Sequence, residues 1–109
     1  MKNEHLLQKI QRHTERNFEE QLSFLSELVS FKSLVGHEGE AQRVYAKACR
    51  ELGLKVELFE AEKEKIKNHP AYIEIGLDYT GRPNVVTRTN GSTDAPSLIL
   101  NGHMDVVSP

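Results

Sequence analysis

The chain has few of the features that mark secreted, membrane or nucleic-acid-binding proteins. Its single cysteine, Cys49, excludes an internal disulfide framework and favours a reducing, cytoplasmic location. Its apolar runs are too short to span a bilayer, and the N-terminus lacks the apolar core and small-residue cleavage site of a signal peptide. The 14 basic and 16 acidic residues are interspersed rather than clustered. We therefore expect neither a nucleic-acid nor a membrane partner.

The first half of the sequence predicts helices. Residues 4–16 are strongly polar and favour a helix that frays. From Asn17 to about Lys32, apolar residues recur at helical spacing and form one face of an amphipathic helix that we expect to pack on a sheet: Phe18, Leu22, Leu25 and Val29. A second helix is expected over residues 40–52, ended by Gly53, with a buried stripe made of Ala41, Val44, Ala48 and Leu52.

The second half predicts strands. Residues 54–60 alternate apolar and charged side chains, as in a strand with one face in water. Residues 84–89 form a second apolar strand, and the turn formers of residues 90–96 lead into a third, buried strand over residues 97–102. The last two strands would pair antiparallel. The expected fold is therefore α/β, with two N-terminal helices packed on a mixed β-sheet.

A functional site is expected where the third predicted strand ends. His103 and Asp105 follow the apolar run, and in open α/β sheets ligands gather outside the carboxyl ends of buried strands. Residues two apart in extended chain point the same way. A carboxylate that accepts the imidazole N–H fixes the tautomer and makes the other ring nitrogen a better metal ligand. The spacing therefore predicts His103 as a metal ligand and Asp105 as its orienting partner.

The residues around this pair resemble a known signature. Leu100–Val107 (LNGHMDVV), preceded by Arg82–Val86 (RPNVV), is similar to the N-terminal motif of the co-catalytic metallohydrolases. That family includes acetylornithine deacetylase, succinyl-diaminopimelate desuccinylase, aminoacylase and glutamate carboxypeptidase, and the likeness covers most of the chain from about Phe18 onward. In the family, the motif's His binds one of two zinc ions and its Asp is counted as catalytic. The resemblance thus assigns metal binding to His103 and a catalytic role to Asp105.

The resemblance also implies an activity and a larger protein. The activity would be metal-dependent hydrolysis of the amide bond in small N-acyl amino acids or peptides, with two Zn²⁺ ions in the intact site and Co²⁺ or Mn²⁺ as alternatives. Residues 68–80 resemble an insertion of deacetylase-like members, which favours a deacylase over a peptidase. Family members are several times longer, and their other ligands and general base follow this motif. Residues 1–109 would be the N-terminal portion of a zinc-exopeptidase-like catalytic domain, inactive alone, in a protein expected to be a homodimer.

Two other interpretations use the same residues. In the first, the chain is a small α/β interaction module in which His103 and Asp105 form a structural hydrogen bond without metal. In the second, it is a non-catalytic metal-binding or scaffold relative of the enzymes. A bare His-x-Asp arises often by chance, so the functional interpretation depends on the strand before it and on the upstream match. Two further histidines, His37 and His69, lie in polar loops and are expected to be exposed.

Overall fold

The computed structural model describes residues 2–92 and 94–109, apart from the side chain of Lys2. It divides into two compact units, one up to Ser30 and the other from Phe31 onward. None of the helices among these residues is long and apolar enough to cross a membrane. The molecule is a small protein of mixed α and β structure, as expected at the level of fold class.

The first unit consists of two helices, α1 (Lys2–Arg16) and α2 (Phe18–Ser30). Asn17 joins them through its backbone, because its N–H donates to the carbonyl of His13 (3.2 Å) and its own carbonyl accepts from the N–H of Gln21 (3.0 Å). Both helices were predicted. In addition, acidic side chains occupy the first turn of α2, where the helix dipole favours them.

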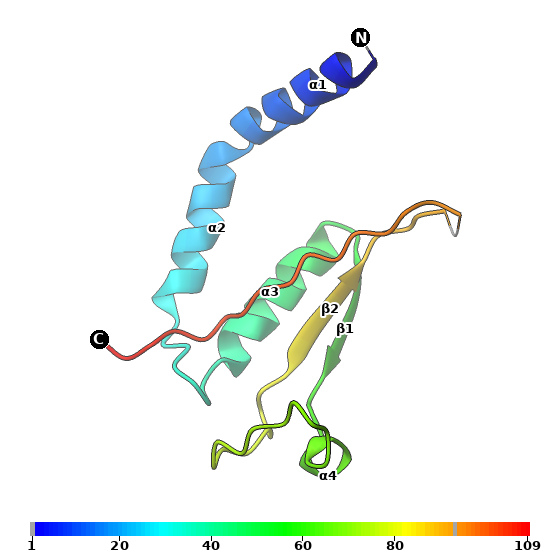
Figure 1. Ribbon diagram of the computed structural model, residues 1–109. Helices are drawn as coiled ribbons and strands as arrows, with labels where there is room; N and C mark the ends of the chain where they lie inside the picture. Colours follow the sequence, from blue (N-terminus) through cyan, green and yellow to red (C-terminus); the bar gives the residue numbers. More distant parts are fainter. Residues whose placement is uncertain (1, 93) are drawn as a thin grey trace. The chain divides into compact units, whose positions relative to one another are not determined.

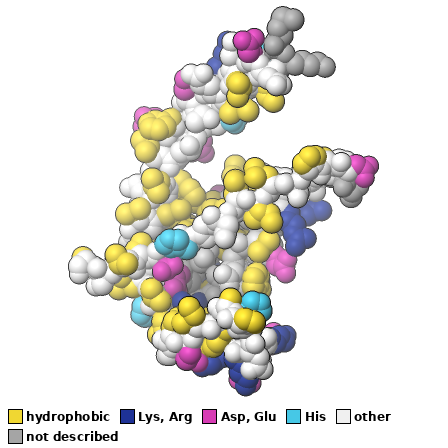
Figure 2. Space-filling model, viewed as in Figure 1, with side chains coloured by type: hydrophobic (Ala, Val, Ile, Leu, Met, Phe, Trp, Pro, Cys, Tyr) yellow, Lys and Arg dark blue, Asp and Glu magenta, His cyan; other side chains and the backbone are white. Residues whose placement is uncertain are grey.

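The apolar face of α2 was expected to be buried, and it is exposed. Its four apolar residues are all exposed, and hydrophobic side chains are visible on the surface of this unit (Figure 2). Helical spacing identifies a face that can be buried, but it does not supply the surface that would cover it. The prediction of a buried stripe was therefore wrong for Phe18, Leu22, Leu25 and Val29.

In the second unit, α3 (Gly39–Glu51) packs on a two-stranded antiparallel sheet formed by β1 (Lys55–Phe59) and β2 (Asn84–Arg88) (Figure 1). The strand register runs from Lys55 opposite Arg88 to Phe59 opposite Asn84. A single turn of helix, α4 (Lys63–Ile66), follows β1 and lies within the charge run of residues 61–67. Solvent-exposed ion pairs such as Lys65–Glu62 flank it.

Small side chains on α3 form the core. Ala41, Ala46 and Cys49 are 0–5% exposed, which lets the helix lie close to the sheet. Of the predicted stripe, Ala41 is buried, Val44 and Ala48 are half-buried, and Leu52 is exposed beyond the helix end. Gly53 adopts a positive φ of 78°, and the N–H of Leu54 donates to the Cys49 carbonyl at 3.1 Å, so the helix ends where the sequence indicated.

The predicted third strand was wrong. Residues 97–102 form no strand, and Leu98, Ile99 and Leu100 are 83–88% exposed. The antiparallel neighbour of β2 is β1 rather than this run. A strand needs a partner for its backbone groups, and three consecutive apolar residues do not specify which edge provides it. Within the preceding turn, Thr93 lies outside the described residues.

Candidate metal and catalytic site

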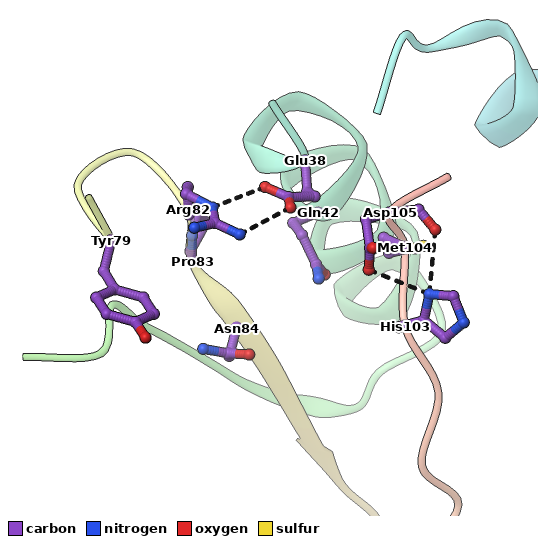
Figure 3. A pocket seen from close by; sticks show the side chains of 9 residues that line it. All are labelled: Glu38, Gln42, Tyr79, Arg82, Pro83, Asn84, His103, Met104 and Asp105. Carbon is purple, nitrogen blue, oxygen red and sulfur yellow. Dashed lines mark hydrogen bonds and ion pairs between the residues drawn. The ribbon is translucent and has the colours of Figure 1, made fainter. Parts of the chain in front are cut away.

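His103 and Asp105 contact each other. The imidazole Nδ1 lies 3.1 Å from Oδ1 of Asp105 and 3.1 Å from the Asp105 backbone carbonyl oxygen (Figure 3). Both acceptors are oxygens, so Nδ1 is the nitrogen that donates, and in the neutral ring Nε2 keeps the lone pair that a metal ion would use. The side chains of His103 and Asp105 are 82% and 39% exposed, so both are accessible from solvent.

The position of this pair differs from the prediction in one respect. His103 lies on an extended but unpaired segment rather than at the end of a buried strand, because residues 97–102 do not join the sheet. What holds the segment is the loop before α3. The N–H of Val106 donates to the Ser33 carbonyl at 2.9 Å, and Leu34 and Val106 form an isolated parallel bridge. Ser33 is buried, so one side of the segment is anchored in the unit's interior.

His103 and Asp105 open onto a hollow of about 180 Å³. Its other walls come from the N-terminal end of α3, from the segment that enters β2, and from Met104 between the two site residues; they are Glu38, Gln42, Tyr79, Arg82, Pro83, Asn84 and Met104 (Figure 3). The sequence motif Arg82–Val86 and the His103 motif thus meet at one place, as members of one site would.

An ion pair between Glu38 and Arg82 forms one wall of the hollow. Nε of Arg82 donates to Oε2 of Glu38 and Nη2 to Oε1, both at 2.9 Å, and the N–H of Gly36 also donates to Oε1 at 2.9 Å. The two side chains are 10% and 16% exposed, respectively. Burial alone would raise the pKa of Glu38, but the hydrogen bonds from Arg82 and from backbone N–H groups lower it to about 2.

Arg82 has two further contacts. Nη1 donates to the Asp78 carbonyl at 3.2 Å, and the guanidinium lies 5.8 Å from the ring centre of Tyr79, within the range of a cation–π contact. Sequence reasoning missed this pair. The partners are 44 residues apart, and no local pattern connects them.

The donor set supplies one metal ligand. Nε2 of His103 is a suitable ligand, and the Asp105 carboxylate is placed to orient it. Among the residues that the structure describes, no three His, Cys, Asp or Glu side chains converge as a metal-binding group. Glu38 already uses both oxygens on Arg82. The residues fit one imidazole ligand with its orienting carboxylate, whereas a catalytic zinc takes three protein ligands.

Two other histidines of the second unit, His37 and His69, do not line the hollow. His37 and His69 are exposed, as expected, and Nδ1 of His69 accepts a hydrogen bond from the N–H of Ala71 at 3.1 Å. That bond stabilises the turn that follows residue 69 and uses one of the two ring nitrogens.

Comparisons with known proteins do not add to this picture. No protein-family model matches the chain, and neither a curated protein nor a solved structure matches it. The likeness to the co-catalytic metallohydrolases therefore stays a prediction that depends on the residues quoted above.

Proposed function

We propose that His103 and Asp105 belong to the active site of a metal-dependent amidohydrolase of the co-catalytic metallohydrolase type, acting on small N-acyl amino acids or peptides. The observation that supports this most is the Nδ1 contact with Asp105, because it leaves Nε2 as the free, exposed nitrogen. The meeting of Arg82 and Asp105 at one hollow is a second support, since both belong to the quoted motifs.

The roles follow from the chemistry of the two side chains. His103 would bind a divalent metal, Zn²⁺ first and Co²⁺ or Mn²⁺ as alternatives, through Nε2. When bound, such an ion polarises the scissile carbonyl and activates water. Asp105 would hold the imidazole in the Nδ1–H tautomer and raise the basicity of Nε2.

The proposal requires further ligands. One imidazole is one ligand of the three that a catalytic zinc takes, so the others, a second metal site and a general base would come from residues outside this chain. The 109-residue chain would then be inactive alone, as part of a larger catalytic domain. We also propose a cytoplasmic location, which is supported by the single cysteine, Cys49, because it is buried and free.

The test uses the protein purified from its native source, together with an edited His103→Ala form. Metal content is measured by mass spectrometry, and release of amino acids from N-acyl substrates is assayed. We expect His103→Ala to lose most of the metal at one site and most of the activity. His69→Ala, which removes an exposed histidine of the same kind, is the matched control and should change neither. Full metal content and turnover in His103→Ala would refute the assignment.

A change at Asp105 separates orientation from ligation. Asp105→Asn keeps the shape of the side chain but weakens the hydrogen bond to Nδ1, so the metal should be retained with an affinity or activity about 10- to 100-fold lower. The measurement is a competition titration with a chelator of known affinity. An unchanged metal affinity together with an unchanged rate would show that Asp105 does not orient the ligand.

The exposed apolar residues favour a second candidate function. The run Leu98–Leu100 and the apolar face of α2 are open to solvent, as in a module that binds another protein. In that case His103 and Asp105 would form a structural hydrogen bond only. The native protein would then contain no stoichiometric metal, and His103→Ala would alter its stability without altering metal content.

A further inference from the structure

The hollow brings one guanidinium near two carboxylates. Arg82 and Asp105 both line it, and Arg82 is bound to Glu38 by two hydrogen bonds of 2.9 Å (Figure 3). The hydrogen-bonded Glu38 carboxylate raises the pKa of Arg82, and the charge of Asp105 adds a smaller contribution in the same direction. Arg82 therefore interacts electrostatically with two carboxylates, those of Glu38 and Asp105, and is hydrogen-bonded to the first.

Asp105 is bonded to a different partner. Its Oδ1 lies 3.1 Å from Nδ1 of His103, whereas the nitrogens of Arg82 are directed to Glu38 and to the Asp78 carbonyl. A guanidinium that grips a carboxylate with two parallel N–H groups is a stronger partner than the single N–H of a neutral imidazole. If Arg82 were released from Glu38, it would compete with His103 for Asp105.

We propose that Glu38 is a positioning residue for the His103–Asp105 pair. Because Glu38 accepts two hydrogen bonds from the guanidinium of Arg82, the Asp105 carboxylate remains available to accept the hydrogen bond from the imidazole of His103. Glu38 is suited to this role because it is held from a second side by the N–H of Gly36, at 2.9 Å, and is nearly buried. It acts through Arg82, to which it is hydrogen-bonded, and His103 is hydrogen-bonded to Asp105. The inference extends the proposed function, but its test needs no metal.

The experiment measures the tautomer of His103 in the metal-free 109-residue chain. Ring ¹⁵N signals are recorded by NMR at pH about 8.5, above the ordinary imidazole pKa of about 6.5, so that the tautomer determines the signal. In the unaltered chain, Nδ1 should carry the proton. In Glu38→Gln, the freed Arg82 should take the Asp105 carboxylate, so that Nδ1–H keeps only the backbone carbonyl of Asp105 as acceptor and the fraction of the Nε2–H tautomer rises. An unchanged His103 signal in Glu38→Gln would overturn the inference.

Two further variants separate competition from loosening of the fold. In the double variant Glu38→Gln/Arg82→Met the competing cation is gone, so the Nδ1–H tautomer should return; a double variant as altered as the single one would mean that Glu38 acts only on the fold. Glu74→Gln is the matched control, because Glu74 is another ion-paired glutamate with a pKa of about 2 but lies outside the hollow. It should leave His103 unchanged, and a shift equal to that of Glu38→Gln would contradict the inference.

The amide spectrum of β1 and β2 reports whether each variant is folded. If Glu38→Gln does not fold, Glu38→Asp decides the matter, because it keeps the negative charge but shortens the arm that matches the guanidinium. A partial shift of His103 toward Nε2–H supports the inference, and an unchanged tautomer overturns it. Neither metal content nor hydrolysis is measured, so failure here leaves the proposed function standing, and failure of that function leaves this result intact.

Discussion

Two glutamates of the second unit have the same low pKa for different reasons. Glu38 and Glu74 each accept a 2.9 Å hydrogen bond from the N–H of a glycine with positive φ, Gly36 and Gly76, respectively. Both carboxyls have a pKa of about 2. At Glu74 the hydrogen bond from Lys63 is the largest cause and burial is a smaller, opposing one. At Glu38 burial is the largest single cause and opposes the lowering, and the hydrogen bonds from Arg82 and from backbone N–H groups together outweigh it.

The difference between the two pairs is burial. The Glu38 and Arg82 side chains are 10% and 16% exposed, whereas those of Glu74 and Lys63 are 51% and 47% exposed. Removing one partner of a buried ion pair leaves an uncompensated charge in the interior, which lowers the free energy of unfolding. Removing one partner of an exposed pair has little effect, because water solvates the remaining charge. A low pKa therefore identifies an interaction, but burial decides whether the fold depends on it.

Arg82→Met should have the largest effect on stability. It leaves the nearly buried Glu38 carboxylate without its cation, a change that typically costs about 3–5 kcal/mol. Urea unfolding of the chain at pH 7, followed by circular dichroism, measures the loss. A decrease below about 1 kcal/mol, the value typical of a surface pair, would show that water reaches Glu38 and that the two regions do not differ as argued.

Acid should weaken the protein through Glu38. Its folded pKa of about 2 lies below the ordinary 4.5, so the folded state binds the proton less tightly than the unfolded state. The stabilisation is complete above pH 4.5 and is lost as the pH falls from 4.5 toward 2, by at most about 3 kcal/mol. The free energy of unfolding is measured over this range for the unaltered chain and for Glu38→Gln/Arg82→Met. Parallel curves for the two proteins would contradict the prediction.

Much of the second unit could be predicted from local pattern. The helix over residues 39–51, its end at Gly53 and the strands at residues 55–59 and 84–88 follow from periodicity and turn chemistry. The contact of His103 with Asp105 follows from two-residue spacing in extended chain. Each of these depends on residues close together in sequence.

The features that sequence reasoning missed depend on distant partners. The run Leu98–Leu100 has the composition of a strand, yet β2 pairs with β1, and among the described residues the run has no strand partner. The wall of the hollow made by Glu38 and Arg82 joins residues 44 apart. Composition and spacing indicate which secondary structure a segment can form. Which segment it pairs with depends on the fold of the whole chain.

Gly39→Ala should lower the free energy of unfolding by an amount between those of the other variants. A Cβ at this position would lie 2.1 Å from the carbonyl oxygen of Gly81, next to Arg82, so the two segments would have to separate. Overpacking of this kind costs about 1–3 kcal/mol. Gly91→Ala is the control, because a Cβ at Gly91 meets nothing within 4 Å. Equal unfolding midpoints for Gly39→Ala and the unaltered chain would mean that the close approach is not needed.

Glu74→Gln should have the smallest effect on stability. It breaks an ion pair whose two side chains are about half exposed, so water and salt replace the lost interaction and the urea midpoint should not change measurably. A local effect is still expected. Burial, followed by the hydrogen bond to Glu74, raises the pKa of Tyr72, so removing the carboxylate should move that pKa down toward the ordinary value of 10.0.

Both effects are read from one protein. Tyrosine ionisation is followed by ultraviolet absorbance, and Tyr72 is distinguished from the other tyrosines by comparison with Tyr72→Phe. A lower Tyr72 pKa with an unchanged midpoint means that the pair forms but the fold does not depend on it. If Glu74→Gln instead lowered the midpoint as much as Arg82→Met does, exposure would not be what separates the two glutamates. The stability of this unit would then depend on its surface charges as much as on the wall of the hollow.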